Sequence, residues 1–376
     1  MKIVIATDKF KGSLSASEAA QSLGRGIKTA LPEAVIEEIP IADGGEGTLD
    51  AAIAAGFTKH LETVSGPTGL PLKATYASRG DEAVIELAQA SGLAQLPDMT
   101  LDPLRASTFG TGQLIRAALN RGCTQIIIGA GGSASTDGGA GLLVALGAEF
   151  LDNTGAPVTP GGGGLADIAQ VNLEGLDKRL QSARFVLASD VDNPLLGPRG
   201  AAAVFGPQKG ARGQDVKQLE AALAHFAQVL ESAIGPRASE ATKAAGSGSA
   251  GGVGYGLMAV LGAQRESGVE LVHHLTNFDD RLAGADLLIS GEGRLDHQSL
   301  GGKAAVGTAQ AAMTRGIPVI AVCGSTTLTG PELEAAGFSR AYSLRDLEPD
   351  LLRCLQNAST LLETTGRILA EDLNSA

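Results

Sequence analysis

The chain has 376 residues, too many for one ordinary hydrophobic core, so two domains are expected. Its net charge of −12 and its aromatic content of 3% argue against a nucleic-acid partner, which would select a basic surface and rings that stack on bases. Hydrophobic residues make up 44% of the chain, enough for substantial cores, yet no apolar run reaches the roughly 20 residues of a membrane-spanning helix, so no membrane partner is expected.

The first part of the chain contains a strand–loop–helix unit twice over. Residues 3–6 are a short β-branched run that predicts a buried parallel strand, and a helix is expected to begin at Ser15, where Glu18 completes a capping box. Residues 35–41 predict a second strand, and residues 48–55 predict a second helix. This rhythm is typical of an open, mostly parallel α/β sheet.

The middle of the chain has a more mixed pattern. Residues 61–87 alternate between polar and apolar and carry glycine–proline turns, which indicates hairpin strands rather than another strand–helix unit. Residues 125–128 and 185–188 predict buried strands, and residues 216–234 predict an amphipathic helix. Residues 161–164 are all glycine and predict a flexible surface loop.

The last hundred residues return to the strand–helix rhythm of the start, so the two ends of the chain resemble each other and differ from the middle. We therefore expect an α/β protein of two domains. A Rossmann- or flavodoxin-like parallel-sheet domain of residues 1–60 and 275–376 would carry an inserted mixed α/β domain, residues 61–274. The elements expected near the C-terminus are strands at 286–290 and 318–322 and helices at 303–315 and 347–369.

Glycine accounts for 52 residues, and many of them gather directly after expected strands. Glycine at such places permits positive φ and close approach of the backbone to a ligand. In open parallel sheets, ligands bind at the carboxyl ends of the strands. The glycine- and aspartate-rich loops that follow strands therefore predict one shared ligand-binding crevice.

The loop after the first strand carries two lysines and a serine. Lys9, Lys11 and Ser13 stand at the start of a helix, whose N-terminus favours anions. This arrangement predicts a clamp for a carboxylate or a phosphate. Two solvated lysines would give the same pattern and are the alternative interpretation.

Two other loops are rich in acids. Residues 43–47 leave two carboxylates on glycine-rich backbone, free to bind hydroxyl groups or Mg²⁺, and an ordinary Asp–Gly turn is the alternative. Asp190 and Asp192 stand at another strand end, where one carboxylate would hold Mg²⁺ and the other would orient an attacking hydroxyl. An Asx turn before Pro194 explains this second loop equally well.

Residues 129–134 fit the loose dinucleotide-binding pattern G-x-G-x-x-A, with Glu149 and Asp152 at about the required distance. An enzyme that transfers hydride is therefore one interpretation. The short, glycine-interrupted helix that follows, and the lack of a convincing second strand before the acid, favour a different use. In that use, successive N–H groups and neighbouring hydroxyls cradle phosphate.

Two more loops complete the set. Residues 291–296 present Arg294, an always-charged planar fork for phosphate or carboxylate, beside Asp296. Residues 247–256 hold a sixth glycine cluster. Close helix packing is the favoured interpretation of that cluster, and contact with a phosphate or with adenine is the alternative.

Taken together, these loops resemble those of the type-I glycerate kinase family over nearly the whole chain. Several long motifs in the expected order carry the resemblance and are far more specific than any single glycine-rich loop. The motifs are residues 5–14, 41–48, 131–134, 136–141, 190–195, 251–254 and 291–296.

The resemblance implies that ATP phosphorylates D-glycerate with the help of Mg²⁺, that 2-phosphoglycerate is the product, and that the active site lies in the cleft between two α/β domains. ATP and D-glycerate are then the expected small-molecule partners, and a homo-oligomer is compatible with this. Cys123, Cys323 and Cys354 fit no metal-ligand pattern, and the chain starts without signal-peptide features, so a cytoplasmic location is expected.

The resemblance and the loop chemistry together give a hypothesis for each site residue. Asp190 is expected to orient or deprotonate the attacking hydroxyl, with Lys9 and Arg294 as further catalytic residues. The alternatives are an NAD(P)-dependent dehydrogenase of a small hydroxy acid and a non-catalytic nucleotide sensor. The other expected site residues are Lys11, Ser13, Asp43, Gly44, Gly45 and Glu46 for substrate, Gly131, Gly132, Ser133, Ser135 and Thr136 for the cofactor ATP, and Asp192 and Asp296 for the metal.

Overall fold

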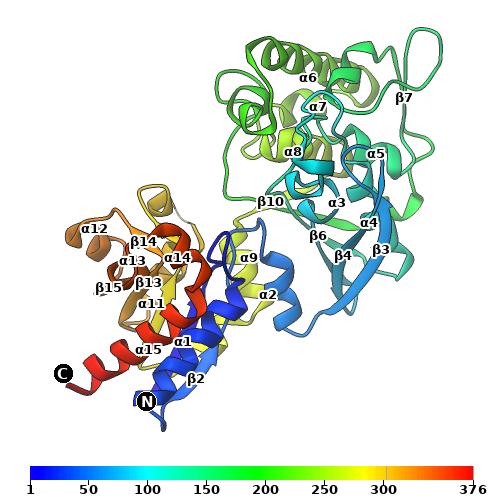
Figure 1. Cartoon of the computed structure of the whole chain (residues 1–376). Helices are drawn as coiled ribbons and strands as arrows, with labels where there is room; N and C mark the ends of the chain where they lie inside the picture. Colours follow the sequence, from blue (N-terminus) through cyan, green and yellow to red (C-terminus); the bar gives the residue numbers. More distant parts are fainter. Residues whose placement is uncertain (302, 376) are drawn as a thin grey trace. The chain divides into compact units, whose positions relative to one another are not determined.

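The computed structural model describes residues 1–301 and 303–375 and divides the chain into two compact units (Figure 1). Unit 1 comprises Met1–Asp43, Asp50–Gly56 and Gly268–Ala376, and unit 2 comprises Gly44–Leu49 and Phe57–Ser267. The sequence predicted one domain of residues 1–60 and 275–376 and a second domain of residues 61–274. The last residue of the first predicted domain, Ala376, lies outside the described residues. Among the described residues, no helix combines the length and the apolar character needed to cross a membrane.

Unit 1 is built on a five-stranded sheet in which every pair of neighbours is parallel. The two ends of the chain supply its strands, which confirms the expected parallel-sheet domain. The sheet order is β15-β13-β11-β1-β2, with β1 (Lys2–Thr7), β2 (Val35–Glu38), β11 (Leu287–Gly291), β13 (Val319–Cys323) and β15 (Arg340–Ser343).

Two apolar clusters cover the two faces of this sheet. Val4 and Leu288 belong to one cluster, and Ile3 and Ile289 belong to the other. Successive side chains of a strand point to opposite faces, so this alternation shows that both faces are buried. The elements around the sheet are α1 (Ala16–Ala30), α9 (Gly268–Leu275), α10 (Phe278–Leu282), α11 (Ala304–Met313), α12 (Gly330–Ala335), α13 (Leu344–Leu347), α14 (Leu351–Gln356), α15 (Ala358–Ser375), the 3₁₀ turn Ser299–Gly301 and the short strands β12 (Arg294–Leu295) and β14 (Ser325–Thr326).

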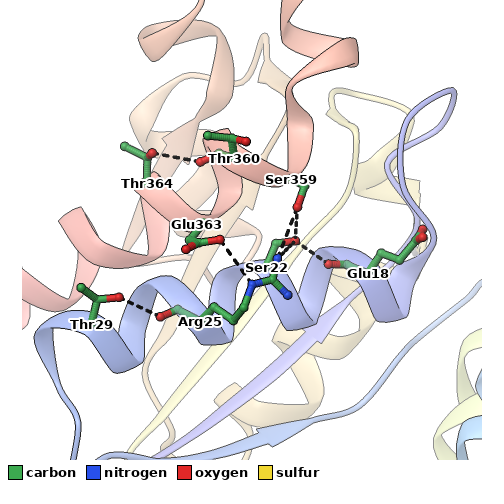
Figure 2. Close-up of polar contacts among 8 residues, drawn as sticks. All are labelled: Glu18, Ser22, Arg25, Thr29, Ser359, Thr360, Glu363 and Thr364. Carbon is green, nitrogen blue, oxygen red and sulfur yellow. Dashed lines mark hydrogen bonds and ion pairs between the residues drawn. The ribbon is translucent and has the colours of Figure 1, made fainter.

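Helices α1 and α15, from opposite ends of the chain, lie side by side (Figure 2). Ser22 and Ser359 share a hydrogen bond of 2.8 Å, and Arg25 pairs with Glu363 at 3.3 Å. Gly26 makes the close approach possible, because a Cβ there would collide with the Glu363 carbonyl. The capping box predicted at the start of α1 is also present.

The single helix predicted over 347–369 is wrong, because this stretch contains two breaks. Pro349 follows α13, lacks an N–H and restricts Glu348 to extended backbone, with φ −133° and ψ 97°. Asp350 then caps α14 through the Arg353 N–H, and Asn357 ends it. Helix α15 is therefore a separate element.

Unit 2 contains a six-stranded mixed sheet of order β10-β9-β6-β5-β4-β3. In chain order, the first three strands of this unit pair antiparallel with one another, which confirms the predicted hairpins, and the remaining strand pairs are parallel. Its strands are β3 (Thr58–Ser65), β4 (Pro71–Arg79), β5 (Glu82–Glu86), β6 (Gln125–Gly129), β9 (Arg184–Ala188) and β10 (Gln264–Glu266). Its helices are α3 (Ala88–Ser91), α4 (Phe109–Asn120), α5 (Ala140–Ala145), α6 (Gly213–Ile234), α7 (Arg237–Ala241) and α8 (Ser249–Leu261), with α2 (Thr48–Ala54) crossing the boundary between the units.

Two glycine clusters of unit 2 serve packing. The flexible surface loop predicted at 161–164 is wrong, because Gly162 and Gly164 are buried in a 3₁₀ helix, Gly162–Asp167, and a Cβ on Gly164 would meet the Thr159 carbonyl. The glycines of α8 lie against the loop after β6, where a Cβ on Gly252 would be 2.9 Å from the Gly138 Cα. The predicted packing role of the second cluster is therefore confirmed.

Candidate active site

In unit 1, three acids meet at the carboxyl ends of parallel strands. Asp8 follows β1, Glu292 follows β11, and Asp43 ends the segment after β2. Backbone hydrogen bonds hold these segments together: the Asp8 N–H donates to the Gly291 carbonyl at 2.9 Å, and Ile41 N–H donates to the Thr7 carbonyl at 3.1 Å. This edge of the sheet is where parallel α/β folds bind ligands.

The electrostatics of this acid cluster are unusual. Burial raises the pKa of Asp8 to about 6 and outweighs Lys9, whose ammonium lies 3.3 Å from the Asp8 carboxylate, while Asp43 adds to the rise. Burial also raises the pKa of Glu292 to about 7, and the charges of Asp8 and Asp43 add to it against the effects of Ser299 and Lys303. The Oε1 atom of Glu292 is buried and finds no hydrogen-bond partner within the described part of the chain. The cluster would gain from a bound cation.

The predicted anion clamp lies beside these acids. Gly293 packs against the loop after β1, since a Cβ on it would be 3.0 Å from the Lys11 N atom, and its N–H donates to the Lys9 carbonyl at 3.4 Å. The structure therefore brings the 8–13 and 291–296 loops together. Arg294 pairs with Asp296 at 3.0 Å while 68% of its side chain is exposed, and Ser13 donates to the Phe10 carbonyl.

In unit 2, the glycines after Asp43 meet the loop after β6. A Cβ on Gly129 would be 2.6 Å from the Gly44 carbonyl oxygen, and one on Gly131 would be 2.6 Å from the Gly45 Cα and 3.2 Å from the Glu46 N atom. The two loops thus lie backbone against backbone. The unit boundary falls between Asp43 and Gly44, inside the predicted motif.

The 131–136 loop has exposed glycine and buried hydroxyls. Gly132 has φ +69° and is exposed, whereas Ser133, Ser135 and Thr136 are at most 4% exposed. Lys209, buried beneath the loop, donates to Ser133 Oγ at 2.7 Å and to the Ser135 carbonyl at 2.5 Å. The exposed face of the loop is therefore backbone rather than side chain.

The loop after β9 starts next to the loop after β6, because these strands are paired neighbours. Asp190 is half-buried there. Asp192 is 64% exposed and pairs with Arg199 at 2.8 Å, and this hydrogen bond lowers the Asp192 pKa. Asn193 donates to the Arg199 carbonyl at 2.7 Å. Among the described residues, no group of three His, Cys, Asp or Glu side chains is arranged to hold a metal ion unaided.

The geometry of a dinucleotide-binding unit is not present around residues 129–134. Helix α5 begins only at Ala140, and Glu149 belongs to β7 (Glu149–Leu151). Strand β7 pairs with β8 (Gln170–Asn172) in a separate antiparallel ribbon and not with the parallel sheet. Asp152, the other candidate acid, directly follows β7, so neither acid of the loose fingerprint is at the end of a neighbouring parallel strand, where a ribose would be held.

Sequence reasoning left out four residues that the structure places beside the predicted ones. Asp8 and Glu292 stand directly after strands inside the quoted motifs, and this position was the available signal. Asp137 and Lys209 carry no such signal. A cavity of about 1010 Å³, with Phe109 in its lining, opens elsewhere on unit 2, and none of the predicted site residues lines it.

Comparison with known proteins gives one consistent result. A family model described as the glycerate kinase family matches residues 3–374. Glycerate kinase from Bacillus subtilis (strain 168) is 42% identical, with 100% of this chain and 98% of that protein covered. Glycerate 2-kinase from Escherichia coli (strain K12) is 45% identical, with 92% of this chain and 90% of that protein covered. The crystal structure of a protein from Salmonella typhimurium LT2 is 40% identical, with a TM-score of 0.86 over 100% of this chain and 98% of that one.

Proposed function

Since this chain belongs to the glycerate kinase family, we propose that it transfers the γ-phosphoryl group of ATP to the 2-hydroxyl of D-glycerate, with Mg²⁺ as the metal. Glycerate kinase activity itself follows from the family and from relatives similar over their full length. The 2-hydroxyl is favoured because the relative at 45% identity is named glycerate 2-kinase. The observation that carries the site proposal is the cluster of Asp8, Asp43 and Glu292 beside Lys9.

The acids of unit 1 fit Mg²⁺. The buried Glu292 Oε1 has no hydrogen-bond partner in the described part of the chain, and burial and mutual repulsion raise the pKa values of Asp8 and Glu292. A hard cation would bind that oxygen and reduce the repulsion between the carboxylates. Mg²⁺ takes one or two carboxylates together with phosphate oxygens, so a complete protein cage is not needed. Asp8, Asp43 and Glu292 would hold it, whereas Asp192 and Asp296 each pair with an arginine. When bound, the ion neutralises charge on the phosphoryl oxygens.

The cations and glycine loops would bind the two substrates. Lys9, Lys11 and Arg294 would hold the glycerate carboxylate and the phosphoryl group, because charge-assisted hydrogen bonds to such anions are strong. The 131–136 loop would receive the ATP phosphates through backbone N–H groups, since its exposed face is backbone. Ser13, Gly44, Gly45 and Glu46 remain the predicted contacts for the glycerate hydroxyls, and Asp43, first predicted among them, is assigned to the metal.

In the transfer step, the glycerate hydroxyl oxygen bonds to the γ-phosphorus while the bond to the β–γ bridging oxygen breaks and ADP leaves. Asp190 would orient the hydroxyl and accept its proton. Positioning and charge neutralisation supply most of the rate enhancement in such reactions. An active site in the cleft between the two units, a cytoplasmic location and a homo-oligomer stay predictions.

A coupled assay of ADP release, run over a panel of small hydroxy acids, tests this function. D-Glycerate should give the highest kcat/KM, Mg²⁺ should be required, and ³¹P NMR of the product should show phosphate on the 2-hydroxyl. Phosphate on the 3-hydroxyl would contradict the regiochemistry. NAD(P)H with keto acids should give no absorbance change, because the dinucleotide geometry is not present.

A further inference from the structure

Lys209 is a buried ammonium whose hydrogen bonds go to the predicted phosphate loop. It ends the 3₁₀ helix Pro207–Lys209, and only 1% of it is exposed. Its Nζ donates to Ser133 Oγ and to the Ser135 carbonyl, 76 and 74 residues away in the chain. Nζ also lies against α8, since a Cβ on Gly251 would be 2.7 Å from it.

The partners of this ammonium are neutral groups. Asp137 is the acid whose charge acts on Lys209, but its carboxylate accepts hydrogen bonds from the Thr108 N–H and hydroxyl and from the Gly139 and Gly141 N–H groups. Burial lowers the Lys209 pKa to about 7 against the opposing effect of Asp137. A buried charge in this situation destabilises the fold, and an apolar side chain of similar volume would fill the space without that penalty. Packing alone does not explain a lysine here.

The direction of the hydrogen bonds supplies an explanation. When protonated, Lys209 only donates, so its Nζ gives one hydrogen bond to Ser133 Oγ and one to the Ser135 carbonyl and ties these two loop residues together. The hydroxyls of Ser135 and Thr136 are buried and have no hydrogen-bond partner in the described part of the chain, so Lys209 is a major polar anchor of this loop.

We propose that Lys209 is a positioning residue for ATP: its buried ammonium holds the 131–136 loop in the conformation whose backbone N–H groups receive the phosphates. This rests on the proposed role of the loop in binding ATP. The ligand class is a nucleoside triphosphate or diphosphate. Glycerate binding is not expected to depend on Lys209.

The test compares Lys209→Met and Lys209→Gln with the wild type and with Lys217→Met, an exposed lysine on α6 as the control. Calorimetric titration with MgADP measures the Kd, steady-state kinetics give KM for ATP and for glycerate, and scanning calorimetry gives the thermal midpoint. Loss of a charge-assisted hydrogen bond should raise the Kd and the KM for ATP by roughly tenfold in both Lys209 variants. The KM for glycerate should change less than about twofold, and the thermal midpoint of Lys209→Met should stay level or rise, because the buried charge is gone.

A second pair of variants separates this proposal from the role of the loop itself. Gly132 is exposed to solvent, and its backbone is in the left-handed region, which Asn and Asp tolerate. The variants Gly132→Asp and Gly132→Asn therefore differ mainly by one negative charge. If Gly132→Asp binds MgADP as tightly as Gly132→Asn, the loop does not bind phosphate and the proposed function of the loop is wrong. If Gly132→Asp weakens binding but the Lys209 variants do not, only the Lys209 proposal is overturned. Unfolding of both Lys209 variants, or a lower thermal midpoint with unchanged nucleotide affinity, would assign Lys209 to stability and overturn it as well.

Discussion

Glu292 lies in the electrostatic field of Asp8: burial of the Glu292 carboxyl, and then the negative charge of Asp8, raise its pKa to about 7. Asp8 itself is raised to about 6, mainly by burial. Ionising both of these carboxyl groups, which stand at adjacent strand ends, destabilises the folded chain. A cation bound there would relieve that destabilisation.

The first prediction concerns stability in the variant Glu292→Gln. The pKa of Glu292 is higher in the folded chain, about 7, than its ordinary value of 4.5, so the folded state binds more protons between these values and loses stability as the pH rises through them. Above pH 7 the Glu292 carboxyl is ionised in the folded chain, and the full loss of stability caused by its buried charge is present. The urea midpoint of Glu292→Gln should therefore exceed that of the wild type at pH 8, and the difference should shrink toward pH 4.5.

Equilibrium urea unfolding across this pH range, followed by circular dichroism, measures the effect. Asp346→Asn, at an exposed acid of unit 1, serves as the control for the loss of one carboxylate elsewhere in the same unit. A constant difference for Glu292→Gln would show that its carboxyl is not perturbed. Added Mg²⁺ with ADP should stabilise the wild type more than Glu292→Gln if this acid helps to hold the metal.

The second prediction concerns Asp190. If its carboxylate accepts the hydroxyl proton, Asp190→Asn should lower kcat by about 10²- to 10⁴-fold, with a much smaller change in the KM values. Asp192→Asn, two residues on, is the matched comparison: its carboxylate is in an exposed ion pair with Arg199, and such pairs contribute little to stability. Near-normal turnover in Asp190→Asn, or equal losses in both variants, would refute the assignment.

The third prediction concerns Arg294. Its guanidinium pairs with Asp296 but is mostly exposed, so a glycerate carboxylate can compete for it. Arg294→Lys keeps the charge and loses the planar fork, so it should raise the KM for glycerate by about tenfold and change the KM for ATP little. Arg340→Gln breaks another exposed ion pair of unit 1 and should leave both KM values unchanged. A larger rise for ATP than for glycerate would place Arg294 on the nucleotide.

The strand–loop pattern predicted much of the group of charged residues at the strand ends of unit 1. Parallel strands end at one edge of a sheet, so the residues that follow them lie together there. Lys9, Asp43 and Arg294 could be named from this rule alone. Lys209 could not, because its contact with the 131–136 loop spans more than seventy residues and depends on how unit 2 packs. The burial of Ser135 was equally hidden, since it follows from the close approach of Gly251 in α8.

Glycine-rich sequence was also an ambiguous signal for the same reason. Gly132 and Gly164 both stand in glycine runs, yet Gly132 is an exposed loop residue and Gly164 is packed against the Thr159 carbonyl. A glycine is needed both where the chain must be free and where two backbones touch. Only the neighbours in space decide between these uses, and they are contributed by distant parts of the chain.

The fourth prediction uses such a backbone contact. Gly131 does not have positive φ, so alanine is compatible with its torsion angles, but the new Cβ would lie 2.6 Å from the Gly45 Cα and 3.2 Å from the Glu46 N atom. Neither neighbour is a flexible side chain, so the 43–47 and 129–134 loops must separate. Overpacking of this kind costs about 1–3 kcal/mol. Gly131→Ala should therefore lower the free energy of unfolding by that amount, and it should also lower kcat/KM.

Gly213→Ala is the control for this last variant, because Gly213 opens helix α6 without positive φ and a Cβ there meets nothing within 4 Å. That variant should stay within about 0.5 kcal/mol of the wild type and keep full activity. Urea unfolding and the coupled ADP assay measure the two quantities separately. If Gly131→Ala lost stability but kept its kcat/KM, the contact between the loops would be structural only, because displaced loops that bound substrate would have to weaken turnover or affinity.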